Sequence, residues 1–284
     1  MEEKRKIFGL SPNVIWMGVV SFLNDLSSDM IFPFIPIFLT SVLGASLTFV
    51  GVVEGVADAT ASILKIVSGW LSDRWQRRKS LVVAGYSFSA LAKPLLALAV
   101  APWHVLGVRF LDRVGKGARE SPRDALISLS TERARLGRAF GFHRGMDTLG
   151  AALGPLAAFA ILPLINQNYR LLFLLSFIAS FFAVLILVFF VREVRAPVGG
   201  SEPARERPVI TDVRPNLFTA VPRADRNSFL SRLGAPFFLF LAIAVIASLG
   251  RASEAFLILR AREVGIAVIF IPLLYVAFSI TYAL

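Results

Sequence analysis

The stretch at residues 105–127, VLGVRFLDRVGKGARESPRDALI, carries a dense set of acidic and basic side chains between long apolar runs. If a helix enters a membrane at Trp103 and rises about 1.5 Å per residue, Asp112 and Arg113 lie near the middle of a hydrocarbon core about 30 Å thick. A charged side chain that faces lipid at that depth costs about 2.5–3.5 kcal/mol. We therefore expect Asp112, Arg113 and Lys116 to face a polar interior, where they can exchange partners with a proton or a charged solute.

Carboxylates on three other apolar stretches are the candidate partners of these charges, and they are Asp25, Asp29, Glu54, Asp58 and Asp147. The first four form two pairs with i,i+4 spacing, so each pair occupies one face of its helix. Lys65, two turns after Asp58, is a candidate partner for that carboxylate. A fixed ion-pair network that only joins helices is one interpretation of the pattern. A network that moves protons or solute is favoured, because ionisable groups inside a membrane usually mark a pathway.

Residues for other kinds of chemistry are not recognisable in the sequence. There is no Cys, and there is no glycine-rich phosphate loop, metal-ligand cluster or Ser/His/Asp constellation. His143 is expected to be a packed or solvated side chain rather than a proton relay. We therefore expect no enzymatic activity, no cofactor and no metal, and we expect membrane lipid, protons and a small solute as the partners.

The elements that position these charges are apolar helices. Hydrophobic residues make up 56% of the 284 residues and charged residues only 17%, whereas about 25% is usual in soluble domains. Stretches of about 20 apolar residues, long enough to cross a membrane as helices, recur along the chain. Eight spans are expected, at about 13–42, 47–71, 79–100, 103–126, 137–164, 170–191, 236–258 and 265–284.

The basic residues between the spans indicate which side of the membrane each loop faces. Lys and Arg gather before the first span, between the second and third, between the fourth and fifth, and after the sixth. Because Lys and Arg are biased toward cytoplasmic loops, we expect these segments and the N-terminus to lie in the cytoplasm. The protein is expected to be a multi-pass protein of the inner membrane of a prokaryote. The net charge of +11 is thereby explained by topology, and no nucleic-acid partner is expected.

The polar stretch 193–235 is rich in Pro, Arg and Gly and is expected to be a cytoplasmic linker. It separates a six-helix bundle at 1–192 from the start of a second bundle at 236–284. SSDMIFPFI in the first span aligns with ASEAFLILR in the seventh, and LGASLTF with VGIAVIF, which pairs Gly44 with Gly265. If this repeat is real, the chain stops inside the second helix of the second bundle, so it is expected to be truncated at its C-terminus.

The loop GWLSDRWQRRKSL at 69–81 resembles the signature loop of the major facilitator superfamily. The matching residues are Gly69, Asp73, Arg74, Arg77 and Arg78. Gln76 replaces a glycine of the family pattern. RFLDRVGKG resembles the fourth-helix motif of the same family, with Arg109, Gly115 and Gly117 matching. Asp112 and Arg113 replace Gln and Gly there and add charge.

The fifth span, GFHRGMDTLGAALGPLAAFA, resembles the antiporter motif of the same superfamily, which is associated with proton-coupled efflux. The matching residues are Gly141, Gly150, Gly154 and Pro155, and Ala158 replaces a final glycine. Glycines spaced four apart allow a neighbouring helix to approach closely, and proline favours a bend.

The resemblance implies an all-α polytopic membrane protein of the major facilitator type, with a complete six-helix N-terminal half and the first two helices of the C-terminal half. It implies alternating access about a midplane site and proton-coupled export of a small amphiphilic or cationic solute, in the manner of the drug:H+ antiporter branch. Asp25, Asp29 and Asp58 are the first candidates for the carboxylate that gains and loses the proton, and the full-length protein is expected to be monomeric. The alternatives are a solute:H+ symporter or facilitator for uptake, and a truncated membrane protein that does not transport.

Overall fold

The computed structural model describes residues 9–75, 77–194, 235–249 and 253–283. The chain divides into two compact units, one formed by residues 1–196 and 253–284 and the other by residues 197–252. Within the second unit the structure describes one helix, α9 (Ala235–Leu249), which is apolar along its length. Most of the expected linker at 193–235 lies outside the described residues, so its boundaries stay a prediction.

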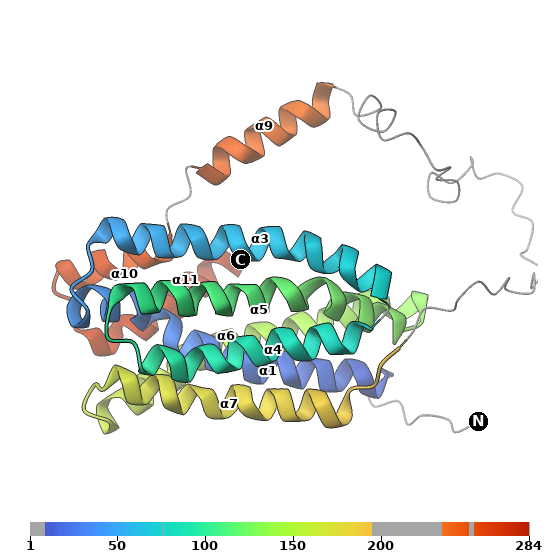
Figure 1. Cartoon of the computed structure of the whole chain (residues 1–284), viewed down its shortest axis with the longest axis horizontal. Coiled ribbons are helices and arrows are strands. Elements are labelled where there is room, and N and C mark those ends of the chain that lie inside the picture. Colours follow the sequence, from blue (N-terminus) through green and yellow to red (C-terminus); the bar gives the residue numbers. More distant parts are fainter. Residues whose placement is uncertain (1–8, 76, 195–234, 250–252, 284) are drawn as a thin grey trace, which may run out of the picture. The chain divides into compact units, whose positions relative to one another are not determined.

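The first unit is built from long helices (Figure 1), and the described residues contain no strand. Its helices are α1 (Pro12–Ile31), α3 (Leu47–Trp75), α4 (Arg78–Ala97), α5 (Pro102–Leu129), α6 (Leu136–Leu164), α7 (Tyr169–Phe190), α10 (Glu254–Glu263) and α11 (Ile271–Ala283). Short helical turns complete it, namely η1 (Phe32–Phe34), α2 (Ile35–Ile37), η2 (Phe38–Val42), η3 (Arg133–Arg135) and η4 (Val268–Phe270). The expected all-helical fold is confirmed.

The first six expected spans agree with the helices of the structure to within a few residues. The first span is one continuous path from α1 through η1, α2 and η2, and it is broken into short turns because Pro33 and Pro36 each remove a helical hydrogen bond. Five segments of the described residues are long and apolar enough to cross a membrane: 12–42, 47–75, 78–97, 133–164 and 169–190. Helix α5 is of similar length, with 28 residues, but its charges keep it out of this group.

The expected span at 236–258 corresponds to two helices, α9 and α10, and residues 250–252 between them lie outside the described ranges. The Ser253 side chain caps α10, since its hydroxyl oxygen accepts a hydrogen bond from the Ala255 backbone N–H at 3.3 Å. Serine at this position favours a helix start. Hydropathy does not detect this helix start, so the sequence predicts a single span across 236–258.

Helix α1 packs against α6 and α7, and α4 packs against α5 and α7. Helix α5 also packs against α3, while α11 packs against α6 and α10 against α2. The C-terminal segment 253–283 therefore belongs to the same compact unit as the six long helices (Figure 1).

The two glycines that the proposed repeat aligns adopt the same unusual backbone conformation. Gly44 has φ 67° and Gly265 has φ 92°, a left-handed region that favours glycine. Each lies three residues before a new helical segment, α3 at Leu47 and η4 at Val268. This agreement supports the alignment of the first and seventh spans.

Candidate functional site

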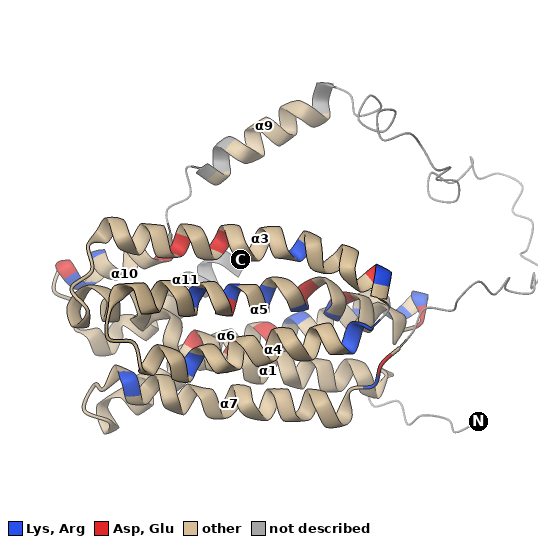
Figure 2. Cartoon of the chain, in the orientation of Figure 1, with Lys and Arg blue, Asp and Glu red and all other residues tan. Residues whose placement is uncertain are grey.

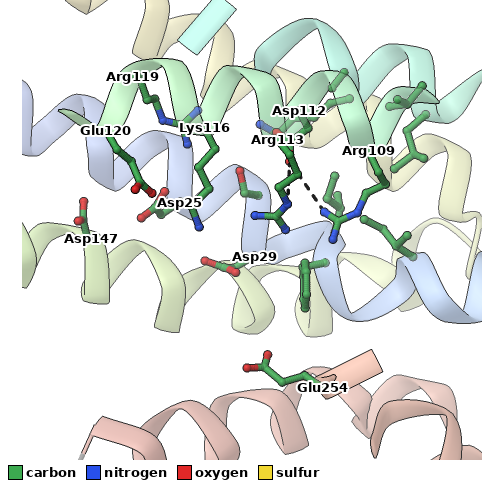
Figure 3. A pocket seen from close by; sticks show the side chains of 18 of the residues that line it. Asp25, Asp29, Arg109, Asp112, Arg113, Lys116, Arg119, Glu120, Asp147 and Glu254 are labelled. Carbon is green, nitrogen blue, oxygen red and sulfur yellow. Dashed lines mark ion pairs between the residues drawn. The ribbon is translucent and has the colours of Figure 1, made fainter. Parts of the chain in front are cut away.

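A cavity of about 320 Å³ lies among α1, α4, α5 and α6, with residues of α10 and α11 contributing to its wall. Seven of its lining residues are Lys or Arg and six are Asp or Glu, which is far more charge than an ordinary cavity between apolar helices holds. Figure 3 shows the side chains from α5, α1 and α6 converging on this space. The charged lining residues are Asp25, Asp29, Lys93, Arg109, Asp112, Arg113, Lys116, Arg119, Glu120, Arg123, Arg144, Asp147 and Glu254.

Helix α5 supplies more of these charges than any other element, and Figure 2 shows blue and red residues recurring along it. Its lining residues follow a spacing of three or four, from Arg109 through Lys116 to Arg123. Residues with that spacing share one helix face. Helix α5 also packs against α3 and α4, and this packing turns its charged face toward the cavity.

Arg109 is held in a buried ion pair with Glu54 of α3. One guanidinium nitrogen, Nη2, lies 2.9 Å from both carboxylate oxygens of Glu54, and the two side chains are 5% and 7% exposed. The guanidinium also stacks over the Phe32 ring, with 5.1 Å to the ring centroid. Asp112 lies 3.8 Å from its Nη1. Arg109 and Glu54 therefore join α3 to α5, and Glu54 itself does not line the cavity.

Asp25 and Asp29 of α1 line the cavity without an ion pair to any described residue. Asp25 accepts a hydrogen bond of 3.0 Å from the Asn24 amide. Asp29 accepts one of 3.3 Å from the Tyr275 hydroxyl of α11. In Figure 3 the Arg113 and Lys116 side chains extend from α5 toward these two carboxylates. The structure therefore brings the acidic face of α1 opposite the basic face of α5.

Three cations of the cavity wall also lack a carboxylate partner within the described part of the chain. Lys116 makes neither an ion pair nor a hydrogen bond there. Lys93 donates a hydrogen bond of 3.4 Å to the Ser89 carbonyl. Arg119 donates one of 2.6 Å to the Ser89 hydroxyl and stacks over the Tyr86 ring at 4.4 Å. Basic side chains without partners are costly in a buried site, so this side of the cavity suits an acidic group from outside the chain.

Asp147 belongs to a second polar network, which runs from the cavity into the protein. Its carboxylate lies 3.5 Å from Nδ1 of His143 and 3.6 Å from the Arg144 guanidinium. The other ring nitrogen of His143 shares a hydrogen bond of 2.8 Å with the Ser21 hydroxyl, which in turn shares one of 3.0 Å with the Tyr86 hydroxyl. His143 is 1% exposed, so it is packed rather than solvated, and it connects Asp147 to α1 and α4.

Asp58 lies outside this cavity, and its side chain is exposed on α3. Lys65 pairs with Glu120 at 3.0 Å rather than with Asp58. Of the three carboxylates expected to titrate first, only Asp25 and Asp29 share the cavity. Glu54 and Asp58 are separated because the first faces α5 while the second is turned away from it.

Several cavity residues were missed by sequence reasoning. Arg119, Glu120 and Arg123 continue the spacing of the α5 charges, so that pattern could have identified them. Glu254 aligns with Asp29 in the repeat, and both line the cavity. No local signal in the sequence points to Arg144 or Tyr275.

The signature-loop residues lie away from the cavity, around the turn between α3 and α4. Arg78 is buried, and its Nη2 lies 3.8 Å from Oδ1 of the exposed Asp73. Arg74 stacks over the Trp70 ring at 5.5 Å, Arg77 is exposed, and Gln76 lies outside the described residues. The start of α4 is capped by Glu193, whose carboxylate accepts hydrogen bonds from the backbone N–H groups of Arg78 at 3.1 Å and Lys79 at 2.9 Å.

The glycines of the fourth-helix and fifth-helix motifs lie where helices touch. A Cβ at Gly115 would lie 2.5 Å from the Gly85 carbonyl oxygen, and one at Gly117 would lie 2.8 Å from the Ala61 carbonyl oxygen. On α6, Gly150 and Gly154 face α1 in the same way, and Pro155 beside them is buried. Gly141 differs, since a Cβ there would meet no neighbouring side chain or backbone within 4 Å. The other motif glycines therefore set the distances between α5 and its neighbours and between α6 and α1.

No group of three or more His, Cys, Asp or Glu side chains arranged to hold a metal ion occurs among the described residues. The charged side chains that line the cavity can bind protons and charged groups.

Comparison with known proteins connects this arrangement to a family. The profile of the Major Facilitator Superfamily matches residues 17–284. An uncharacterized MFS-type transporter from Methanocaldococcus jannaschii is 34% identical over 280 residues, which are 96% of this chain and 64% of that protein. The multidrug resistance protein MdtG of Salmonella newport is 28% identical over 207 residues, which are 71% of this chain and 49% of that protein.

Solved structures share the fold. A POT family transporter crystallised with a thioalcohol-conjugated peptide superposes with a TM-score of 0.61 at 17% identity, over 87% of this chain and 48% of that one. A bacterial homologue of the human lysosomal transporter Spinster, in an inward-facing conformation, superposes with a TM-score of 0.56 at 15% identity, over 68% of this chain and 46% of that one. The chain thus spans about two thirds of the archaeal relative and about half of the other proteins.

Proposed function

Because the chain belongs to the Major Facilitator Superfamily, we propose that it is a secondary transporter, monomeric when full-length, that exports a small solute in exchange for protons by alternating access. Its several long apolar helices make it a multi-pass membrane protein. The basic loops expected between the spans favour a cytoplasmic N-terminus and, in a prokaryotic cell, the inner membrane.

The observation that carries the proposal is the pair of carboxylates on α1 that line the cavity without an ion pair, Asp25 and Asp29. Protonation removes the charge of such a carboxylate, and removal of that charge lowers the cost of closing a cavity around it. The charges that face Asp25 are Lys116 and Arg119 of α5 and Asp147 of α6. Gain or loss of a proton at this pair therefore changes the net charge of a site that contains several other charged groups.

Asp29 has a similar set of neighbours. Arg113 and Lys116 of α5 and the Tyr275 hydroxyl of α11 act on it, together with Asp25 on its own helix. Lys93 of α4 faces both carboxylates. A proton at Asp29 would shift the attraction between α1 and the basic face of α5, which is the kind of change that alternating access requires.

Two observations support export over uptake. The residues on α6 that resemble the antiporter motif pack directly on the carboxylate-bearing part of α1, since a Cβ at Gly150 would lie 3.2 Å from the Asp25 Cβ and one at Gly154 would lie 3.1 Å from the Asp29 carbonyl carbon. The relatives also include a multidrug resistance protein. Uptake with protons is the second candidate, and the sign of the coupling separates the two.

The test reconstitutes the chain in lipid vesicles and measures accumulation of three radiolabelled probes of equal chain length. They are 6-aminohexanoate, hexanesulfonate and hexyltrimethylammonium, all of which stay charged and cross lipid slowly. Antiport predicts that at least one probe accumulates when the vesicle interior is acidic, whereas symport predicts accumulation when the interior is alkaline. If neither gradient drives any of the three probes, the proposed function is wrong.

Variants of the carboxylates complete the test. Asp25→Asn and Asp29→Asn should each abolish the dependence on the pH gradient, because the proton-binding group is removed. Asp58→Asn is the matched control, since it removes a carboxylate that lies outside the cavity, and it should leave the dependence intact. Equal loss in all three variants would contradict the assignment to α1.

A further inference from the structure

We propose that the cavity binds a small zwitterion, with the acidic group of the solute against Arg113 and Lys116 of α5 and its amino group against Asp25 and Asp29 of α1. This inference rests on the proposed function, because it names the class of solute that the same cavity carries. It follows from a juxtaposition across one cavity: Arg113 and Lys116 of α5 keep unused hydrogen-bond donors, and the facing carboxylates of α1 have no ion pair to any described residue (Figure 3).

The α5 side offers donors that no described residue uses. Lys116 makes no ion pair or hydrogen bond, although it lines the cavity. Arg113 forms a long ion pair with Asp112, with 4.0 Å between its Nε and the carboxylate. The buried Nε has no hydrogen-bond partner. A carboxylate, sulfonate or phosphate group of a ligand can accept from both side chains, and a planar acidic group suits the fork of a guanidinium.

The α1 side offers acceptors in the same way. Asp25 and Asp29 each accept one hydrogen bond from a neutral donor, Asn24 and Tyr275 respectively. A carboxylate has two oxygens and about four acceptor positions, so most of their capacity is unused. An ammonium carries three donors, and the i,i+4 spacing of the two carboxylates lets one ammonium reach both.

Most of the other charges in the wall are already compensated within the protein. Arg109 pairs with Glu54, Glu120 with Lys65, and Arg123 with Asp124 at 3.1 Å. Asp147 has Arg144 and His143 beside it. A ligand with a single positive charge would leave the basic face without a partner, and a ligand with a single negative charge would leave the acidic face without one. A ligand that carries both charges satisfies the two faces together.

The remaining lining residues indicate where the rest of the solute lies. The apolar residues of the cavity lining are Ile31, Phe32, Ile35, Ala92, Leu96 and Val108. They come from the end of α1 and the turns after it, the end of α4 and the start of α5, and these parts lie at one end of the bundle because α4 and α5 are antiparallel and consecutive. Apolar surface for the methylene groups of the solute is therefore available at this end of the cavity. The cavity volume of about 320 Å³ is at the lower end of the range for small-molecule sites.

The test measures equilibrium binding of the same three probes to the purified chain in detergent, which requires no transport. We expect 6-aminohexanoate to bind at least about tenfold more tightly than hexanesulfonate, and hexyltrimethylammonium to bind least, since a tenfold ratio corresponds to about one lost charge contact. Binding of the cation as tight as that of the zwitterion, or no binding of any probe, would overturn the inference.

Two variants assign the faces. Lys116→Gln should weaken binding of 6-aminohexanoate and hexanesulfonate alike, because both place an acidic group at α5. Asp29→Asn should weaken binding of 6-aminohexanoate only and leave hexanesulfonate unchanged or tighter. Arg138→Gln is the control, because it removes an exposed positive charge that does not line the cavity, and it should change neither.

The outcomes of the two tests are distinguishable. Selective binding of the zwitterion without transport would support the proposed class of solute and contradict the proposed function. If the pH gradient drives transport but both assays show a preference for hexyltrimethylammonium, the proposed function is supported and the proposed class of solute is wrong.

Discussion

Gly150 of α6 lies directly against Asp25 of α1: a Cβ at position 150 would be 3.2 Å from the Asp25 Cβ and 2.5 Å from the Phe22 carbonyl oxygen. The contact leaves no room for a side chain at position 150. The glycine on α6 therefore determines how closely α6 approaches the part of α1 that bears Asp25. The same relation holds one turn further on, where a Cβ at Gly154 would lie 2.6 Å from the Leu26 carbonyl oxygen.

The first prediction concerns this contact. Gly150→Ala should lower the free energy of unfolding by about 1–3 kcal/mol, because a methyl group placed against backbone forces α1 and α6 apart. Thermal unfolding of the purified chain in detergent measures the effect. Gly141→Ala is the matched control on the same helix, where a methyl group meets nothing within 4 Å, and it should be neutral or stabilising by up to about 1 kcal/mol. Equal destabilisation by both substitutions would mean that the close approach does not matter.

The second prediction concerns the buried pair of Arg109 and Glu54, which are 2.9 Å apart. Glu54→Gln should destabilise the fold by about 3–5 kcal/mol, because it leaves the Arg109 guanidinium buried with its main partner gone. The double variant Glu54→Gln/Arg109→Gln should recover part of that loss in a double-mutant cycle. An additive cycle, with no recovery, would show that the two side chains are not coupled.

A control for the second prediction exists on α10, where Arg260 and Glu263 form a pair of the same length, 2.9 Å, with both side chains exposed. Glu263→Gln should change the free energy of unfolding by less than about 1 kcal/mol, because exposed pairs are weak.

The third prediction concerns His143, which connects Asp147 to Ser21. Ser21→Ala should destabilise the fold by about 1–3 kcal/mol, because a buried ring nitrogen loses its hydrogen-bond partner. When the ring is already removed, as in His143→Ala, the further change Ser21→Ala should cost much less. Unfolding of the two single variants and the double variant gives the coupling, for which we expect about 0.5–3 kcal/mol. A coupling near zero would contradict the bond.

The fourth prediction concerns Glu193, which caps the start of α4 beside the signature loop. Glu193→Ala should destabilise the chain by about 0.5–2 kcal/mol, as the loss of an N-terminal helix cap does elsewhere. Glu193→Gln keeps an acceptor oxygen and should retain part of the stability. Hydrogen exchange at the backbone amides of Arg78 and Lys79 provides a local measurement, and both should exchange faster in Glu193→Ala. Unchanged exchange at these two amides would rule out the cap.

The sequence by itself determined the elements and the family of this protein. The length of each apolar stretch predicted the first six spans, because a helix needs about 20 residues to cross a membrane. The cost of charge inside a membrane predicted that Asp112, Arg113 and Lys116 face a polar interior. The motifs around Gly69, Arg109 and Gly150 pointed to the family that the comparisons then confirmed. These features are local, since each depends only on residues near one another in the chain.

Only the tertiary structure decided which charges meet. Glu54 and Asp58 are one helical turn apart and equivalent by sequence, yet Glu54 is buried against Arg109 while Asp58 is exposed and outside the cavity. Tyr275 reaches Asp29 across 246 residues of chain. A periodic pattern determines which residues share a face of their own helix, but the rotation of that helix against its neighbours depends on packing, such as the close contact of Gly150 with α1. The physical reason is that the face a helix turns inward is set by all the surfaces it touches, and no single segment of sequence contains them.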